Sequence, residues 1–243
     1  MQTSRLDTEL TRRGLVYSRS QAESYIKLGT VKLNGKTVTK AGTPVQETDR
    51  LERTAQQQYV SRAALKLASV ARALGLDFAG KTVLDVGSST GGFTDYALKH
   101  GAAKVIAVEL GTGQLHPSLH GNPQIELHEQ TDIRSFVTDQ TIDIVVADVS
   151  FISLREILPS VAKLCNPGTQ IAAMVKPQFE AAASNQKHKG VIKNDRMRRD
   201  ILKDFETWSA GKFRIVDKAD SQVSGGKGNV ERFYLLRVLS PRR

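Results

Sequence analysis

A carboxylate and an amine each follow a short apolar, β-branched segment of this chain. Asp148 ends the segment 142–148, and Lys176 ends the segment 171–176. A charged side chain at the end of a buried strand is costly to remove from water without a partner, so we expect the two to face each other or a substrate. An amine held by an acid can act in proton transfer. A purely structural ion pair is the alternative.

A glycine turn follows another apolar segment, residues 82–86. Asp85 lies inside this segment, two residues before Gly87, and Gly91 precedes a helical pattern over 92–99. Glycines allow a ligand to approach the backbone, and the free N–H groups at the start of a helix attract negative charge. The spacing is Asp-x-Gly-x-x-x-Gly, unlike the Gly-x-Gly-x-x-Gly of dinucleotide sites. A glycine-rich turn without a ligand is the alternative.

Two further acids follow predicted strands. Glu109 closes the strand 105–109, and it lies at roughly the ~20-residue offset from Asp85 that is typical of a ribose-binding acid in nucleotide folds. Asp132 follows the strand 125–129 and could contact a ligand at the same edge of the sheet. The alternative for Asp132 is a turn aspartate that caps residues 133–134.

Composition narrows the class of protein. The 243 residues carry 35 Lys and Arg against 25 Asp and Glu, a net charge of +10 that favours polyanions such as nucleic acid, although a basic proteome is an alternative. The single cysteine, Cys165, excludes an internal disulfide, and we expect it to pack on a helix. His116 and His120 are separated by Pro117, so we expect no metal site. Without a signal sequence or a long apolar run, we expect a cytoplasmic protein.

The first 53 residues predict a compact α-α-β-β module. Helical patterns cover 5–13 and 18–28, with a capping pattern at Ser18, and a hairpin follows around Asn34-Gly35. The basic residues of this module exceed its acids, so we expect them to be unneutralised, or else to form a solvated face. Residues 54–60 are polar and predict a linker.

Strands and helices alternate in the remainder of the chain. A helix is expected from Ser61, as its cap, to Gly75, with Lys66 snorkelling beside an apolar stripe. The predicted strands are 82–86, 105–109, 125–129, 142–148, 171–176, 213–218 and 232–238, and the predicted helices are 92–99, 115–120, 154–164 and 197–209. The rhythm predicts a doubly wound α/β fold with a parallel sheet. The loop before residue 232 is too short for a helical crossover, so the last strand should be antiparallel.

The spacing of Asp85, Gly87 and Gly91 resembles the first motif of class I methyltransferases, which implies transfer of a methyl group, and elimination then narrows the atom that is methylated. The sequence after Asp148 is Val-Ser-Phe, without the Pro-Pro-aromatic run usual in amino-group methyltransferases. Cytosine C5 methylation needs a nucleophilic cysteine, and Cys165 lies away from the expected site. Methylation of oxygen remains.

Several motifs together resemble one family. The turn from Asp85 to Thr94 resembles the first motif of class I S-adenosylmethionine methyltransferases. The N-terminal module resembles the S-four RNA-binding domain. A third set, Lys66, Asp148, Lys176 and Glu231, resembles the Lys-Asp-Lys-Glu tetrad of FtsJ-type ribose 2′-O-methyltransferases. From about residue 5 to 239 the chain is similar to the TlyA family, bacterial enzymes that methylate cytidine 2′-hydroxyls of ribosomal RNA, some of them labelled haemolysins.

The resemblance implies a class I methyltransferase fold with a seven-stranded sheet, divided into an RNA-binding domain (1–53), a linker (54–60) and a methyltransferase domain (61–243). It implies S-adenosylmethionine as cofactor, bound by Asp85, Gly87, Ser88, Ser89, Thr90, Gly91, Gly92, Phe93, Glu109, Asp132 and Asp148. The RNA-binding residues are expected to be Arg5, Arg12, Arg13, Arg19, Ser20, Lys27, Lys32, Lys36 and Arg62.

The resemblance also implies roles for the tetrad. Lys176 would be the base that takes the proton of the ribose hydroxyl, with Asp148 orienting it. Glu231 would hold Lys66, and Lys66 would steer the ribose. Basic residues at 187–189 and at 196, 198 and 199 could contact phosphates beside the target, or form a solvated loop.

The implied partner is ribosomal RNA or a ribosomal subunit, bound by a monomer without a membrane. Two other classes of function stay open at this point. One is a non-catalytic ribosome-assembly factor that keeps only the fold of an enzyme, against which the complete tetrad argues. The other is a membrane-active haemolysin, for which the sequence offers no spanning segment.

Overall fold

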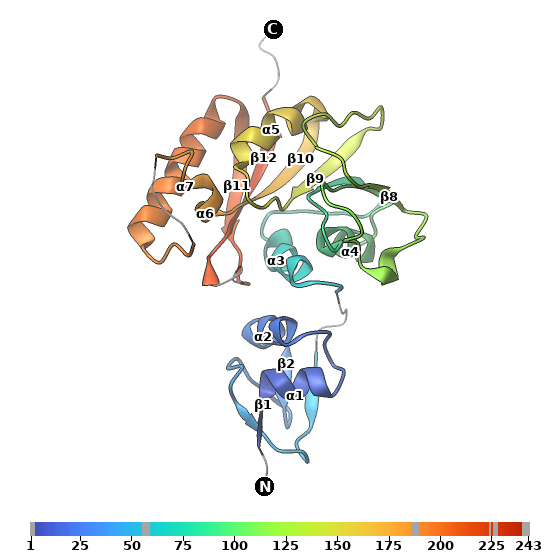
Figure 1. Cartoon of the computed structure of the whole chain (residues 1–243), viewed down its shortest axis with the longest axis vertical. Helices are drawn as coiled ribbons and strands as arrows, with labels where there is room; N and C mark the ends of the chain where they lie inside the picture. The colour runs from blue at the N-terminus through green and yellow to red at the C-terminus, as the bar shows by residue number, and fades with distance from the viewer. Residues whose placement is uncertain (1–2, 55–58, 186–189, 224, 226–227, 240–243) are drawn as a thin grey trace.

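The structure is a computed structural model that describes residues 3–54, 59–185, 190–223, 225 and 228–239. A small N-terminal module lies next to a larger α/β body, and α2 of the module faces α3 of the body (Figure 1). The expected basic segment 187–189 lies outside the described residues, as does most of the predicted linker.

The N-terminal module packs two helices on short strands. Its helices are α1 (Leu6–Arg12) and α2 (Arg19–Lys27), and its strands are β1 (Ser4–Arg5), β2 (Val31–Leu33), β3 (Lys36–Thr37), β4 (Pro44–Val45) and β5 (Leu51–Arg53). The Ser18 hydroxyl accepts a hydrogen bond from Gln21 N at 3.2 Å, so the predicted cap is present. The hairpin turns at Asn34-Gly35, and β2 pairs with both β3 and β5.

Two buried acids neutralise arginines of this module, contrary to expectation. Asp7 accepts hydrogen bonds from Arg5 and Arg19, and Glu9 accepts them from Arg12 and Arg13. Burial opposes ionisation of Asp7, but the hydrogen bonds from its arginines lower its pKa to about 2. Hydrogen bonds from Arg12 and Arg13 lower the pKa of Glu9 to about 2. Comparing the numbers of basic and acidic residues did not reveal this pairing, because the numbers do not show that Asp7 and Glu9 are buried beside the arginines.

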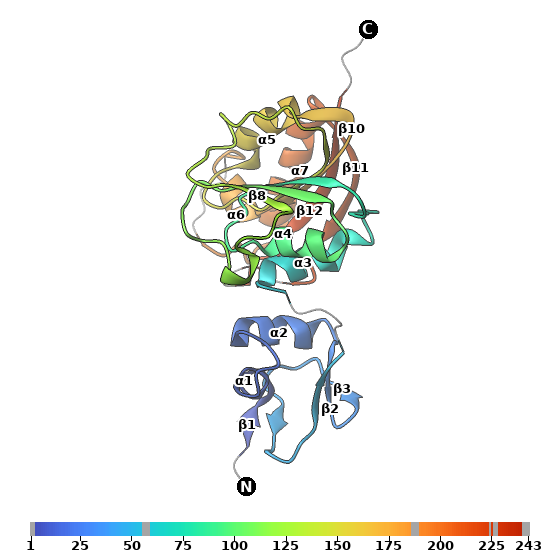
Figure 2. The same cartoon turned by 90° about the vertical axis from the view of Figure 1, so that its right-hand side faces the viewer.

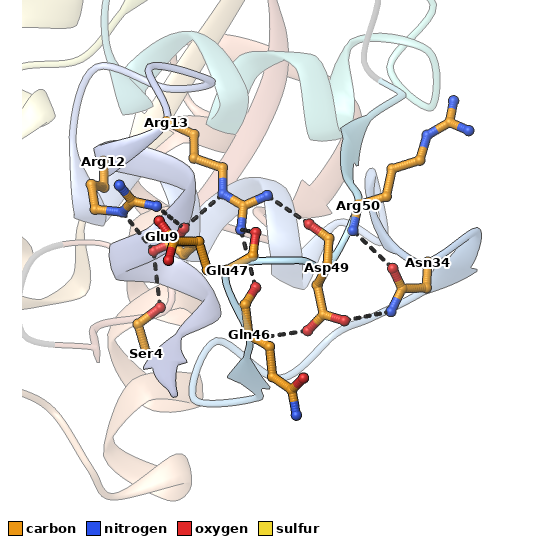
Figure 3. A network of polar contacts seen from close by, with 9 residues as sticks. All are labelled: Ser4, Glu9, Arg12, Arg13, Asn34, Gln46, Glu47, Asp49 and Arg50. Carbon is orange, nitrogen blue, oxygen red and sulfur yellow. Dashed lines mark hydrogen bonds and ion pairs between the residues drawn. The ribbon is translucent and has the colours of Figure 1, made fainter. Parts of the chain in front are cut away.

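Arg13 also closes a loop of the module (Figure 3). Its guanidinium donates to the backbone carbonyls of Gln46, Glu47 and Asp49. The Asp49 side chain in turn accepts from Asn34 Nδ2 at 2.7 Å. With only 23% of its side chain exposed, Arg13 serves the structure of the module.

The body is built on one seven-stranded sheet. Its strands are β6 (Thr82–Val86), β7 (Lys104–Val108), β8 (Ile125–His128), β9 (Ile142–Ala147), β10 (Cys165–Val175), β11 (Phe213–Asp220) and β12 (Arg232–Val238). They are ordered β11-β12-β10-β9-β6-β7-β8, and β12 runs antiparallel to both neighbours. The expected sheet with a reversed last strand is therefore confirmed, and with it the class I methyltransferase fold.

Helices cover both faces of the sheet (Figure 2). They are α3 (Arg62–Ala71), α4 (Gly92–Lys99), α5 (Leu154–Lys163), α6 (Pro177–Glu180) and α7 (Asp195–Ala210). One apolar core joins α3 and α4 to one face and continues into the N-terminal module. A second core joins α5 and α7 to the other face. The central parallel strands β6, β7 and β9 are mostly apolar and buried on both sides, as is usual for parallel strands covered by helices.

The strand register brings four strand ends to one edge. Val86 of β6 pairs with Ala147 of β9, and Ala147 pairs with Ala173 of β10. Val175 of β10 pairs with Arg232 of β12. The residues just beyond these pairs are Gly87, Asp148, Lys176 and Glu231. They therefore share the edge of the sheet at which ligands bind in open α/β folds.

A buried carboxylate joins two of the loops at this edge. Glu180, at the end of α6, accepts hydrogen bonds from Ser153 Oγ at 2.6 Å and from Leu154 N at 2.7 Å, at the start of α5. Burial raises the pKa of the Glu180 carboxyl. The loop from Asp148 to Ser153 is thus fixed near both ends to the segment from Lys176 to Glu180.

The N-terminal module meets the body through the last residues of the predicted linker and through one ring contact. Gln21 donates to the carbonyl of Tyr59 at 2.6 Å, and Val60 N donates to Asp95 in the first turn of α4 at 2.9 Å. Tyr17 of the module lies against His116 of the body, with 5.8 Å between the ring centres. The helix that begins at the glycine turn therefore also anchors the chain that comes from the module.

Three local expectations were wrong. Residues 115–120 form only a 3-10 turn over Pro117–Leu119, because Pro117 and Gly121 interrupt the helical pattern. Cys165 begins β10 and is not on a helix. Ser61 precedes α3, but its hydroxyl has no hydrogen-bond partner among the described residues, so it is not a side-chain cap.

We call the two hydrogen bonds that Glu180 accepts from Ser153 and Leu154 the Glu180 clamp, and we expect it to stabilise the fold. Glu180→Ala removes the acceptor of a buried hydroxyl and of a helix-terminal N–H, so we expect a loss of about 2–4 kcal/mol in the free energy of unfolding. Urea unfolding measures the loss. Glu180→Gln keeps one acceptor oxygen and should lose less. A change in the alanine variant within experimental error would contradict the role of the clamp.

Candidate active site

A cavity of about 670 Å³ opens at the edge of the sheet where the strand ends meet. The ends of β6 and β7 line it, together with the segments that follow β8 and β9. Of the predicted cofactor-binding residues it contains Gly87, Ser89, Glu109, Asp132 and Asp148. Its volume lies within the range of small-molecule sites, about 300–1,000 Å³.

A smaller cavity of about 120 Å³ adjoins the first, and both are lined by Gly87, Ser89, Asp148 and Ser150. Lys176 lines only the smaller one, as do Asp85, Ser88, Thr90 and Phe93. The arrangement is a large chamber that narrows toward an amine. A ligand in the chamber would therefore present one end to Lys176.

The glycine turn has no room for side chains. Gly87 has a φ of +79°, and a Cβ there would lie 2.9 Å from the carbonyl oxygen of Asp148. Gly91 has a φ of +81°, and its Cβ would lie 2.5 Å from Leu119. Gly91 and Gly92 do not line either cavity; they allow α4 to begin close to the turn.

Asp85 is a buried acid with spare hydrogen-bonding capacity. Thr94 donates to its Oδ2 at 2.6 Å, whereas its Oδ1 has no hydrogen-bond partner among the described residues. Burial raises the pKa of Asp85 to about 7. An unpartnered carboxylate oxygen beside a cavity suits a ligand with a positively charged hydrogen-bond donor.

Glu109 is held by the backbone around it. Its carboxylate accepts hydrogen bonds from Ser89 N at 2.9 Å and from Gly111 N at 2.6 Å. Each carboxylate oxygen has a second lone pair, so Glu109 can still accept from a ligand hydroxyl. The glycine turn and the end of β7 are thereby joined at the cavity.

Asp132 caps a turn, which the sequence analysis gave as the alternative to a contact with a ligand. It accepts a hydrogen bond from Arg134 N at 2.8 Å and pairs with the Arg134 guanidinium. The hydrogen bonds from Arg134 lower the pKa of Asp132. It also lines the large cavity, so the turn and contact with a ligand are compatible.

Two lysine–acid pairs lie at this edge. Lys176 Nζ is 2.5 Å from Asp148 Oδ1, and Lys66 Nζ is 2.5 Å from Glu231 Oε2. The side chains of Lys66 and Glu231 are 10% and 2% exposed, so Lys66 does not snorkel to solvent. Neither of these two lines a cavity, but Ala63, one turn before Lys66 on α3, does.

The loop after Asp148 adds residues that the sequence analysis missed. Lys176 Nζ donates to Ser150 Oγ at 2.7 Å. Phe151 lines the large cavity with 91% of its surface exposed, and its φ of +67° is rare for an aromatic residue. Its ring lies 5.2 Å from that of Phe179, centre to centre. The aromatic residue three positions after Asp148 was a signal that could have found it.

The predicted RNA-binding residues fall into two groups. Arg5, Arg12, Arg13 and Arg19 are paired with acids, and all but Arg13 keep more than half of the side chain exposed. The others lie on α2, on the hairpin and at the start of α3: Ser20, Lys27, Lys32, Lys36 and Arg62. Arg198, from the second basic segment, is bound to Asp220.

Two absences hold for the described part of the chain. It contains no cluster of His, Cys, Asp and Glu that could hold a metal ion. None of its helices is both long enough and apolar enough to cross a membrane.

Comparison with known proteins agrees with this geometry. Residues 59–238 match the FtsJ-like methyltransferase family model, and residues 4–51 match that of the S4 domain. The 16S/23S rRNA (cytidine-2′-O)-methyltransferase TlyA of Mycobacterium tuberculosis is 37% identical over 98% of this chain and 91% of its own. Hemolysin A of Brachyspira hyodysenteriae is 37% identical over 93% of this chain and 97% of its own.

A solved structure from Streptococcus thermophilus, of a protein described as a hemolysin, superposes with a TM-score of 0.71. It is 32% identical, and the match covers 99% of this chain and 90% of that one. The glycine turn, the paired lysines and acids and these matches agree: the chain belongs to the FtsJ-like methyltransferase family and carries an S4 domain before its catalytic body.

Proposed function

We propose that this chain is a ribosomal RNA 2′-O-ribose methyltransferase, which transfers a methyl group from S-adenosylmethionine to a cytidine 2′-hydroxyl in the cytoplasm. The observation that carries the proposal is Lys176, an amine held by Asp148 at the narrow end of a ligand-sized cavity. The relative from Mycobacterium tuberculosis is named for this activity on 16S and 23S RNA, which supports the choice of substrate.

The residues around the cavity fit S-adenosylmethionine. Asp85 and the turn at Gly87 would hold its methionine portion, Glu109 its ribose hydroxyls and Asp132 its adenine amino group. The unpartnered Oδ1 of Asp85 supports this assignment, because the methionine portion carries an ammonium. When bound, the cofactor supplies a methyl group that is already activated by its sulfonium.

The tetrad would prepare the ribose for reaction. A hydroxyl is a poor nucleophile until its proton is removed, so a base must lie within hydrogen-bonding reach. Lys176, in its amine form, would take the proton of the 2′-hydroxyl as the oxygen becomes a methyl ether. Asp148 would orient Lys176, while Lys66, fixed by Glu231, would position the ribose.

The surroundings of the site support an RNA substrate. Phe151, exposed at the rim of the large cavity, offers a face on which an unpaired base can stack. A 2′-hydroxyl within folded RNA must be turned outward to reach a cavity at the sheet edge. The N-terminal module would then hold the RNA by its phosphates.

Lys176→Ala tests the proposal directly. We expect single-turnover methyl transfer to fall by at least about 100-fold, since the base is removed, while cofactor affinity stays within a few-fold. Transfer of labelled methyl to ribosomal RNA measures the first and calorimetry the second. Lys163→Ala, an exposed lysine at the end of α5, is the matched control.

The same variants identify the product in cells. Mass mapping of ribosomal RNA should show a ribose methyl group that disappears with the gene and returns with the parent chain but not with Lys176→Ala. An unchanged methylation pattern would favour a non-catalytic assembly factor. Leakage of liposomes by the purified protein would instead favour a membrane-active protein.

The raised pKa of Asp85 predicts pH-dependent cofactor binding. Below about pH 7 the acid is protonated and loses its attraction for an ammonium, so the dissociation constant should rise by up to about tenfold per pH unit. Calorimetry between pH 6 and 8 measures this, and Asp85→Asn should bind weakly without the same dependence. The unliganded chain should behave oppositely and gain stability as the pH falls through 7, because folding then takes up a proton. Cofactor affinity that stays constant across this range would remove Asp85 from the site.

The hairpin lysines should bind RNA, whereas Arg13 should stabilise the module. Replacing Lys32 and Lys36 together by Ala should leave the melting temperature unchanged and reduce the slope of log affinity against log salt by about 1–2. Filter binding at several salt concentrations measures the slope. Arg13→Ala should lower the melting temperature, since Glu9 and three carbonyls lose a donor. An unchanged salt slope in the double variant would exclude the hairpin from the interface.

A further inference from the structure

Ser150 lies at the junction of the two cavities. It belongs to the loop after β9, two residues beyond Asp148, and it lines both the large and the small cavity. Its hydroxyl accepts a hydrogen bond from Lys176 Nζ at 2.7 Å. Ser150 therefore touches the amine from the side on which a ligand would enter.

The contacts of Lys176 fix the direction of its nitrogen. An amine nitrogen has four tetrahedral positions, and Cε occupies one. Ser150 Oγ, which accepts a hydrogen bond at 2.7 Å, accounts for one more. Asp148 Oδ1 lies 2.5 Å from the nitrogen as an ion pair, and no hydrogen bond to this oxygen is found among the described residues. The remaining positions are shared between the carboxylate and the small cavity, which Lys176 lines with 9% of its side chain exposed.

The neutral amine can make the same hydrogen bond to Ser150. An –NH₂ group has two N–H donors, and Ser150 fixes one of them. With the other N–H turned to the ion-paired carboxylate, the lone pair faces the small cavity. With Ser150 absent, the amine could rotate about its Cε–Nζ bond and direct the lone pair elsewhere. The carboxylate alone leaves this rotation open.

We infer that Ser150 is a positioning residue of the methyl transfer, which directs the lone pair of Lys176 at the hydroxyl to be deprotonated. The inference rests on the proposed function, because it needs Lys176 as the base. In the step, the hydroxyl proton moves to Lys176 Nζ, which becomes an ammonium. The Ser150 hydroxyl keeps its own proton throughout.

The charges around Lys176 determine how its protonation responds. Asp148 faces it from the end of β9, Asp85 lines the same cavity from β6, and the Lys66–Glu231 pair lies at the same sheet edge. Ser150 is neutral, so it acts through its hydrogen bond, which is stronger to an ammonium than to an amine. Removing the hydroxyl should therefore favour the amine and shift the rate profile to lower pH.

The test compares Ser150→Ala, Ser150→Thr and Lys176→Ala. In Ser150→Ala we expect the plateau of the single-turnover rate to fall about 3- to 10-fold, the worth of one hydrogen bond. The midpoint of the acid limb should move to lower pH although the plateau is lower. Ser150→Thr, which keeps the hydroxyl, should restore both. Cofactor affinity should stay within a few-fold in all three.

A second readout needs neither cofactor nor RNA. Acetic anhydride reacts with neutral amines, and peptide mass spectrometry gives the extent of acetylation of Lys176 at each pH. In the unliganded Ser150→Ala chain the acetylation profile should move to lower pH, and in Ser150→Thr it should return. A change that was merely structural would lower the rate without moving this profile.

The outcomes distinguish a wrong assignment of Lys176 as the base from a wrong assignment of Ser150 as its positioning residue. Full activity of Lys176→Ala would overturn the proposed base, and with it the role of Ser150. An inactive Lys176→Ala with parental rates and pH profiles in Ser150→Ala would overturn the role of Ser150 alone. A lowered plateau in Ser150→Ala that Ser150→Thr does not restore, with an unmoved acetylation profile, would also overturn it.

Discussion

The register of the central strands is the constraint on which the site depends. Because β6, β9 and β10 run parallel and in step, their last residues lie side by side, and the reversed β12 begins where β10 ends. The glycine turn, one acid–amine pair and the acid of the other pair thereby meet at one edge. A shift of one residue in any of these ladders would turn the side chains to the opposite face of the sheet. The side chains of the two faces pack in two separate cores, so such a shift would disrupt the packing of both.

The site carries a cost that the rest of the fold must offset. Lys66 and Glu231 are almost completely buried, and a buried ion pair is often less stabilising than apolar residues of the same size. Asp85 is still less favourable, since one of its oxygens has no partner among the described residues. The two apolar cores and the Glu180 clamp hold these groups in place. Charged residues that weaken the folded state at the edge of a sheet where cavities open are typical of sites kept for function.

The fold could be predicted from the sequence because its signals are local. Alternating apolar strands and helices, the Asn34-Gly35 hairpin and the spacing of Asp85 and Gly87 each depend on neighbouring residues. The short loop before β12 was enough to predict its direction, and β12 is antiparallel. The wrong expectations came from competing local signals: the helical pattern at 115–120 contains Pro117, and Cys165 was placed by its neighbours in the chain.

Parts of the site could not be predicted because they depend on contacts between distant segments. Nothing near Ser150 in the chain indicates that Lys176, 26 residues away, donates to it. Similarly, Glu180 gave no sign that it would cap a helix that precedes it. The pairing of Asp148 with Lys176 was expected from their places at strand ends, whereas Lys66 and Glu231 were found through resemblance to a family. In the structure each lysine of the tetrad is paired with its acid, whereas the roles of these residues in the reaction stay proposals.

The buried acids of the N-terminal module restrict the motion of the exposed arginines that they bind. Arg5 and Arg19 are fixed by Asp7, yet 52% and 56% of their side chains stay open to solvent. A free arginine loses about 2 kcal/mol of rotamer entropy when it is immobilised. In this module folding has already restricted that freedom, so a polyanion would meet guanidinium groups whose orientation is set in advance. Acids that reduce the positive charge of the surface thereby make it more rigid.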